Sequence, residues 1–116
     1  MRVLNRTAVS VTGGDPYIAW TRGTDSDSGR GMLTVRRAKP YGSVFLLPEF
    51  ESEEDVQEWV EENAAWIFDV LLAAWSEDES SWPATRDLTT FREWFRIDVH
   101  NVVVDAADDD IEGEEL

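Results

Sequence analysis

The sequence predicts a single α+β domain in which a small, mainly antiparallel sheet of about three strands is covered by helices. Strand-like alternation near residues 2–11, 43–47 and 96–104 is separated by stretches with helical periodicity. The 116 residues suit one domain, and 42% hydrophobic residues are enough for its core. We assign residues 1–104 to this domain. Residues 105–116 are mostly acidic and predict a disordered tail.

The first strand and the first helix follow one another near the N-terminus. The last four of residues 2–11 alternate between valine and a small or polar residue, as a strand does. Asp15 is a good N-cap, and Pro16 at the first helical position loses no hydrogen bond. We therefore expect a short helix that ends at about Trp20.

The segment before the second strand has no clear periodicity. Residues 23–31 have the composition of a surface loop, and residues 32–39 suit either a short strand or a helical turn. Residues 43–47 belong to a continuous apolar run that Pro48 ends. Such a run predicts a strand that is covered on both faces.

The strongest helix signal begins at Ser52, whose hydroxyl can cap the helix while Asp55 returns a hydrogen bond. The apolar positions with helical spacing are Val56, Trp59, Val60, Ala64, Ile67, Leu71, Ala74 and Trp75. Beyond Ala64 nearly every face is apolar, which predicts burial of that end. A straight helix over residues 53–75 would be about 35 Å long, so we expect a bend or break near Asn63.

The last helix and strand form the C-terminal part of the domain. Asp87 is the expected N-cap, because an inward stripe follows it. This stripe consists of Leu88, Phe91, Trp94 and Phe95, and such an aromatic stripe is typical of a core. Residues 96–104 alternate as a strand, and the change of phase at Asn101 predicts a bulge. Trp82, in the turn between helices, is the better candidate for an exposed anchor.

Charge divides the chain into two unlike parts. The net charge is −15; residues 1–48 carry +4 and the remainder carries −19. A field of this sign attracts basic partners and repels nucleic acid and anionic lipid. One basic cluster consists of Arg30, Arg36, Arg37 and Lys39, with Tyr41 and Trp20 nearby. The acidic remainder argues against a nucleic-acid interface at this cluster.

Composition also limits the compartment and the chemistry. Cysteine is absent, which excludes disulfides, thiolate metal sites and a cysteine nucleophile. No apolar run approaches the ~20 residues that span a bilayer, and the N-terminus lacks the pattern of an export signal. We therefore expect a cytoplasmic protein that is not associated with a membrane.

Familiar catalytic and metal-binding motifs are missing. His100 is the only histidine, and Asp98 lies two residues away on the same strand face, too far for close contact. A lone histidine without cysteine excludes the usual zinc sites. A calcium loop that begins at Asp25 would place Arg30 and Arg36 where glycine and glutamate are needed. Neither a P-loop nor a G-x-S-x-G motif occurs, and we expect no cofactor and no metal ion.

Aromatic residues recur with a definite spacing over residues 15–104. The segments concerned are Pro16, Tyr17 and Trp20; Leu47 and Pro48; Ile67, Phe68, Leu72 and Trp75; Asp78, Glu79, Trp82 and Pro83; and Phe91, Trp94 and Phe95. This order resembles a group of short acidic bacterial proteins of unassigned function. The resemblance implies a bacterial, cytoplasmic source, and the group has no known activity that could be carried over to this chain.

Two classes of function fit these observations. We expect a non-catalytic binding or inhibitor-type protein that docks a basic protein partner through dense carboxylates. Its partner-facing residues would be Glu54, Glu58, Glu61, Glu62, Glu77, Asp78, Glu79 and Trp82. The alternative is a small enzyme or ligand-binding domain with a pocket between sheet and helices that involves Asp98 and His100. The same carboxylates could also serve solubility alone.

Overall fold

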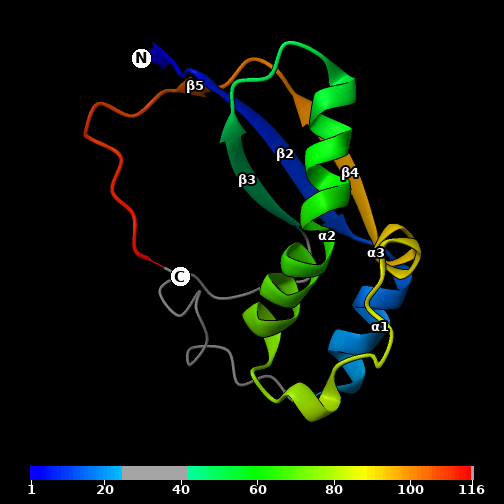
Figure 1. The fold of residues 1–116 in the computed structure, drawn as a ribbon. Coiled ribbons are helices and arrows are strands. Elements are labelled where there is room, and N and C mark those ends of the chain that lie inside the picture. Colours follow the sequence, from blue (N-terminus) through cyan, green and yellow to red (C-terminus); the bar gives the residue numbers. More distant parts are fainter. Residues whose placement is uncertain (25–41, 116) are drawn as a thin grey trace.

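The computed structural model describes residues 1–24 and 42–115 (Figure 1). In chain order, its elements are β1 (Arg2–Val3), β2 (Arg6–Gly13), α1 (Asp15–Gly23), β3 (Gly42–Pro48), α2 (Glu53–Trp75), the 3-10 turn η1 (Glu79–Ser81), α3 (Leu88–Trp94), β4 (Phe95–His100) and β5 (Val104–Asp105). This arrangement confirms the α+β class. Most of the predicted loop at 23–31, the ambiguous stretch at 32–39 and the basic side chains within them lie outside the described residues.

The main sheet has three antiparallel strands in the order β3-β2-β4. The register places Val9 between Phe45 and Val99, and places the next residue, Ser10, between Val44 and Asp98. Because successive side chains alternate between faces, these two rows lie on opposite sides of the sheet. Figure 1 shows α2 crossing one side, and the row that contains Val9 belongs to the core on that side.

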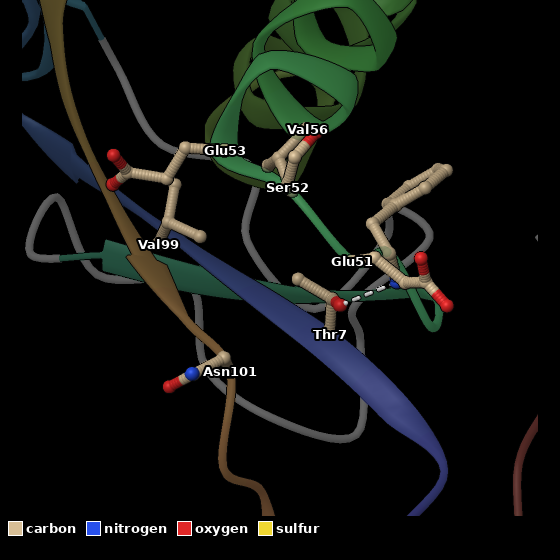
Figure 2. Close-up of a pocket in the computed structure, with 8 residues that line it drawn as sticks. Thr7, Glu51, Ser52, Glu53, Val56, Val99 and Asn101 are labelled. Carbon is tan, nitrogen blue, oxygen red and sulfur yellow. Dashed lines mark hydrogen bonds between the residues drawn. The ribbon is translucent and has the colours of Figure 1, made fainter.

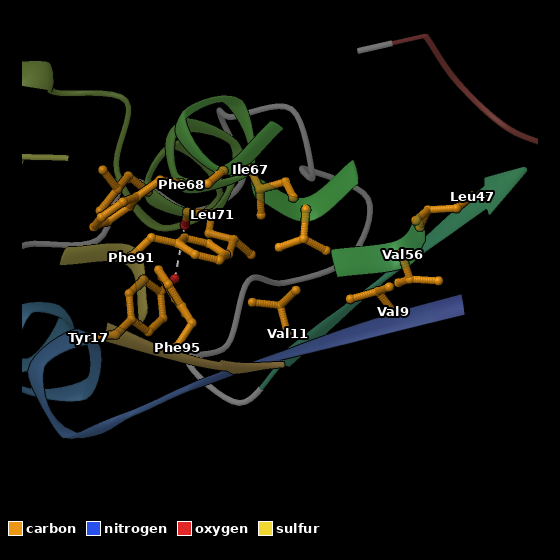
Figure 3. Packing of buried hydrophobic residues seen from close by; sticks show 13 residues of the cluster. Val9, Val11, Tyr17, Leu47, Val56, Ile67, Phe68, Leu71, Phe91 and Phe95 are labelled. Atoms are coloured by element: carbon orange, nitrogen blue, oxygen red, sulfur yellow. Dashed lines mark hydrogen bonds between the residues drawn. The ribbon is translucent and has the colours of Figure 1, made fainter. Parts of the chain in front are cut away.

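The core lies between α2 and this inner face of the sheet (Figure 3). Its buried hydrophobic members are Val9, Val11, Tyr17, Leu47, Val56, Val60, Ala64, Ile67, Phe68, Leu71, Leu72, Phe91 and Phe95. The Phe68 ring centroid lies 6.0 Å from that of Phe91 and 5.3 Å from that of Phe95. Leu88 and Trp94 pack against the same cluster. The predicted aromatic stripe is therefore confirmed as core.

Side-chain caps define the starts of α2 and α3. The Ser52 hydroxyl accepts a 3.2 Å hydrogen bond from the Asp55 amide, and the Asp87 carboxylate accepts one of 2.9 Å from the Thr90 amide. Both predicted N-caps are confirmed. Hydrogen bonds from Thr90 also hold the pKa of Asp87 below its ordinary value, because they favour the charged carboxylate.

The N-cap of α1 differs from the prediction. Gly14 occupies that position, and Asp15 lies in the first turn, where its charge still favours the helix dipole. The Gly14 amide donates a 2.7 Å hydrogen bond to the Trp94 carbonyl. A Cβ atom on Gly14 would lie 3.2 Å from that oxygen, so the close approach of α1 to the end of α3 favours glycine.

Other boundaries also differ from the sequence prediction, and α1 ends at Gly23 rather than at about Trp20. Residues 2–11 divide into β1 and β2, and residues 96–104 divide into β4 and β5, because β1 and β5 pair with each other rather than with the main sheet. The phase change at Asn101 thus marks the end of β4 rather than a bulge. β5 extends to Asp105, one residue into the predicted tail, and Arg2 holds the pKa of Asp105 below its ordinary value through a 2.9 Å ion pair.

The remaining corrections concern β3 and α2. β3 is covered on one face only: Leu47 is buried, whereas Val44 and Leu46 are exposed on the other face. α2 continues from Glu53 to Trp75 without the break that was expected near Asn63. Its length of about 35 Å fits because the molecule is elongated, with a longest extent of 40 Å.

The buried hydroxyl of Tyr17 makes the stability of the fold depend on pH in the alkaline range. Its side chain is buried, and its hydroxyl donates a 2.9 Å hydrogen bond to the Leu71 carbonyl (Figure 3). Burial raises the pKa of Tyr17 from 10.0 to about 12, because the phenolate would be desolvated. Tyr17 therefore stabilises the fold fully below pH 10, and this contribution is lost as the pH rises towards 12.

We expect the free energy of unfolding of the natural chain to fall by about 2–3 kcal/mol more than that of Tyr17→Phe between pH 10 and pH 12. At neutral pH the variant should be less stable by about 1 kcal/mol, because the Leu71 carbonyl loses its donor. Urea unfolding at a series of pH values measures both effects. Parallel pH profiles for the two chains would contradict the assignment.

Candidate functional site

The first half of α2 and the segment that leads into it form a strongly acidic part of the described structure. Residues 49–62 contain eight carboxylates, and residues 40–85 contain no lysine, arginine or histidine. The structure exposes the four helical glutamates that the sequence analysis selected, Glu54, Glu58, Glu61 and Glu62. We call these four residues the carboxylate face. They lie on the helix because its core stripe points to the sheet and leaves the charged positions in solvent.

One member of the carboxylate face already has a partner within the chain. The Glu61 carboxylate accepts a 2.8 Å hydrogen bond from the Arg92 guanidinium of α3, and both side chains are about half exposed. Farther along α2, Asp69 pairs with Arg86 at 3.1 Å. Ion pairs this exposed contribute little to stability. Within residues 1–24 and 42–115, no ion pair involves Glu54, Glu58 or Glu62.

An exposed tryptophan continues this face along the helix. Glu58, Glu62 and Trp66 are separated by four residues each, so they form one row on the helix surface. The Trp66 side chain is 49% exposed, and its ring meets that of Phe45 in a T-shaped contact at 6.1 Å. Sequence analysis missed Trp66, because the apolar residues on either side of it predicted a buried helix end. Its spacing from Glu58 and Glu62 was the available signal.

The second predicted cluster lies at the opposite end of α2. Glu77, Asp78 and Glu79 follow the helix and are exposed. The Asp78 carboxylate caps η1 by accepting hydrogen bonds from the Ser80 amide at 3.1 Å and hydroxyl at 2.6 Å. Twenty-one helical residues, about 32 Å, separate this cluster from Glu54. Since charges are screened over about 8 Å at physiological salt, the two clusters act as separate surfaces.

Trp82, the other predicted binding residue, contributes to the fold. Its indole is half-buried and packs against the core, and its Nε1 donates a 2.9 Å hydrogen bond to the Ser76 carbonyl. The Arg86 guanidinium lies 5.5 Å from the ring centroid, which is cation–π distance. The exposed indole of this protein is thus that of Trp66 rather than that of Trp82.

A small pocket lies between the sheet and the start of α2 (Figure 2). Its volume is about 270 Å³, slightly below the range usual for small-molecule sites. The lining includes the apolar Phe50, Val56 and Val99 and the polar Thr7, Glu51, Ser52, Glu53 and Asn101. Figure 2 shows Glu51 and Glu53 on either side of Ser52. These two carboxylates oppose an anion at the helix N-terminus and suit a cationic side chain instead.

Asp98 and His100 do not line this pocket. They lie on the outer face of the sheet, opposite Ser10 and Ala8 in the register. The His100 Nε2 is 3.0 Å from the Ser10 hydroxyl, and the Asp98 carboxylate pairs with Arg96 at 3.1 Å. Asp98 is therefore engaged by a guanidinium, and His100 is exposed. Asp98 thus pairs with Arg96 instead of serving as the third group of a Ser-His catalytic pair.

Comparison with known proteins gives no further information about this site. No protein-family model, no curated protein and no solved structure matches the chain. The predicted resemblance to a group of acidic bacterial proteins therefore stays a prediction. In the described part of the chain, no helix combines the length and apolarity needed to cross a membrane, and no group of His, Asp or Glu side chains has a metal-binding arrangement.

The exposure of Trp66 can be tested by fluorescence quenching with acrylamide. All six tryptophans lie among the described residues, and the other five are half-buried. We expect Trp66→Phe to lower the fraction of the emission that acrylamide quenches readily. The matched control is Trp94→Phe, because the Trp94 ring packs 5.5 Å from that of Phe68. An equal effect of the two substitutions would show that Trp66 is not the exposed indole.

Proposed function

We propose that this chain is a non-catalytic binding protein that docks a basic protein partner through the carboxylate face of α2. One observation carries the proposal: eight carboxylates lie in residues 49–62, within a stretch of the sequence, 40–85, that has no basic side chain. The structure supports it by exposing all four residues of the carboxylate face. Three of them have no ion pair among the described residues.

The physical basis of such binding is electrostatic steering. A surface of one sign raises the association rate for an oppositely charged partner by one to three orders of magnitude, and salt reduces the effect. The net charge of −15 extends this attraction beyond the contact area and opposes nucleic acid and anionic lipid. We also propose a cytoplasmic location, because a chain without cysteine needs no oxidising compartment to fold.

Within the carboxylate face, Glu58 and Glu62 are the central residues of the proposal. Glu61 is partly neutralised by Arg92, whereas Glu58 and Glu62 lie in the row that leads to Trp66. An exposed indole beside two carboxylates suits a lysine or arginine, which gains both an ion pair and a cation–π contact. The small pocket at Glu51 and Glu53 could accept a second basic side chain of the same partner.

Affinity capture tests this function. The immobilised natural chain should retain a basic protein from a bacterial lysate at low salt and release it at high salt. The double variant Glu58→Gln, Glu62→Gln should bind the same protein roughly tenfold more weakly, because two charges are lost from the contact. Mass spectrometry identifies the retained protein, and its purified form then gives the dissociation constants.

The matched control is Asp108→Asn, Asp109→Asn in the exposed tail. This variant has the same change in net charge but leaves α2 intact. If both double variants lose affinity equally, binding depends on total charge alone and the carboxylate face is not the site. If no basic protein is retained at low salt, the proposed function is wrong.

A further inference from the structure

The two edges of the main sheet differ in chemistry. β3 and β4 are its outer strands. β4 has the sequence FRIDVH and carries charged side chains at alternate positions, a common protection against pairing with another strand. β3 has the sequence GSVFLLP, with no charged residue, and its proline is the last residue. Within residues 1–24 and 42–115, no strand pairs with the outer edge of β3. Among the residues that the structure describes, β3 is therefore the edge that lacks such protection.

Apolar side chains flank this edge on both faces of the sheet. On the outer face, Val44 is 65% exposed and Leu46 is 51% exposed. On the α2 side, Phe45 lies against the exposed ring of Trp66. A strand that joined β3 would thus meet apolar side chains on both faces, while its backbone extended the ladder of hydrogen bonds.

On the α2 side, two carboxylates of the helix lie in one row with Trp66, which contacts Phe45 of this edge. Glu62 is one helical turn from Trp66, and Glu58 is one turn further. On the outer face, β3 itself presents Val44 and Leu46 and no charge. The side chains of a strand added at this edge would alternate between the two faces of the sheet. One set would therefore contact acidic and aromatic groups on the α2 side, and the other set would contact aliphatic groups on the outer face.

We propose that the outer edge of β3 binds an extended segment of the partner as an additional strand, with basic side chains towards Glu62 and Trp66 and apolar side chains towards Val44 and Leu46. This inference rests on the proposed function, because it specifies how the basic partner docks. Charge decides between two candidate occupants of this edge, a second copy of this chain and a basic segment of another protein. A second copy of this chain would bring another net charge of −15 to the same edge, whereas a basic segment is attracted.

The occupant has a definite sequence pattern. Its side chains alternate between faces with a period of two, so lysine or arginine at every second position all point to α2. The intervening valine, isoleucine or threonine residues contact the outer face. β3 has seven residues, which sets the length of segment that can pair with it. Backbone hydrogen bonds supply affinity in such complexes, and the alternating side chains supply selectivity.

The first test uses a seven-residue peptide of alternating lysine and valine with the full-length natural chain. Successive backbone amides of a strand point to opposite edges, so only one alternate set can bond to β3. We expect N-methylation of one set to weaken binding by at least roughly tenfold, since several hydrogen bonds are lost, and methylation of the other set to have little effect. Calorimetry at low salt measures the affinities.

The second test uses two valines of equal exposure. Val44 and Val102 are 65% and 66% exposed, but Val44 lies on β3 and Val102 lies outside the main sheet. Val44→Lys should weaken peptide binding by roughly tenfold, because it replaces an apolar contact with the peptide's valines by a charge, whereas Val102→Lys should not. Hydrogen exchange should show new protection of β3 amides when the unmodified peptide is bound.

Each other outcome overturns the inference. Equal effects of the two methylations, or of the two valine substitutions, would show that the peptide does not add to the sheet. Protection of the outward β3 amides before any peptide is added would show that the edge is already occupied, by a second copy if the protection rises with protein concentration. If a basic protein still binds through Glu58 and Glu62 in these cases, the proposed function stands and only the strand addition is wrong.

Discussion

The packing of α2 against one face of a three-stranded sheet is the constraint on which the rest of this structure depends. Val9 and Val11 of β2 point into the core with Phe68 and Leu72 of α2, and complete burial of such side chains contributes about 1.5–3 kcal/mol each. The three-stranded sheet has two faces, and α2 covers one of them. On the opposite face, the described structure leaves Val44 and Leu46 of the outer strand β3 exposed.

The same packing determines where charge and apolar surface meet. α2 turns its core stripe to the sheet, so its glutamates lie in solvent and Trp66 lies at the border, beside Phe45. Long-range attraction by the carboxylates and short-range contact at β3 are therefore available within one region of the surface. The attraction by the carboxylates would govern the rate of encounter and its dependence on salt. The contact at β3 would govern the orientation of the partner and its residence time.

Local signals in the sequence predicted much of this fold. Ser52 and Asp87 were recognisable as caps because their side chains bond to amides three residues away, and the stripe through Phe91 follows from helical spacing. Features that depend on distant parts of the chain were not predictable in this way. Pairing of β1 with β5 joins residues about a hundred positions apart. The contact of Trp66 with Phe45 likewise joins α2 to a separate strand, and the only local signal of the exposure of Trp66 was its spacing from Glu58 and Glu62.

The uncharged β3 edge has a consequence for the colloidal behaviour of the protein. Edges that natural proteins leave without lysine, proline or a bulge can pair with one another and lead to aggregation. Here mutual repulsion between highly negative molecules opposes that association at neutral pH. The isoelectric point is about 4.2, so mild acid removes the repulsion while the apolar edge stays unchanged. Acidic buffers would thus allow the β3 edges of neighbouring molecules to pair, and the protein would precipitate.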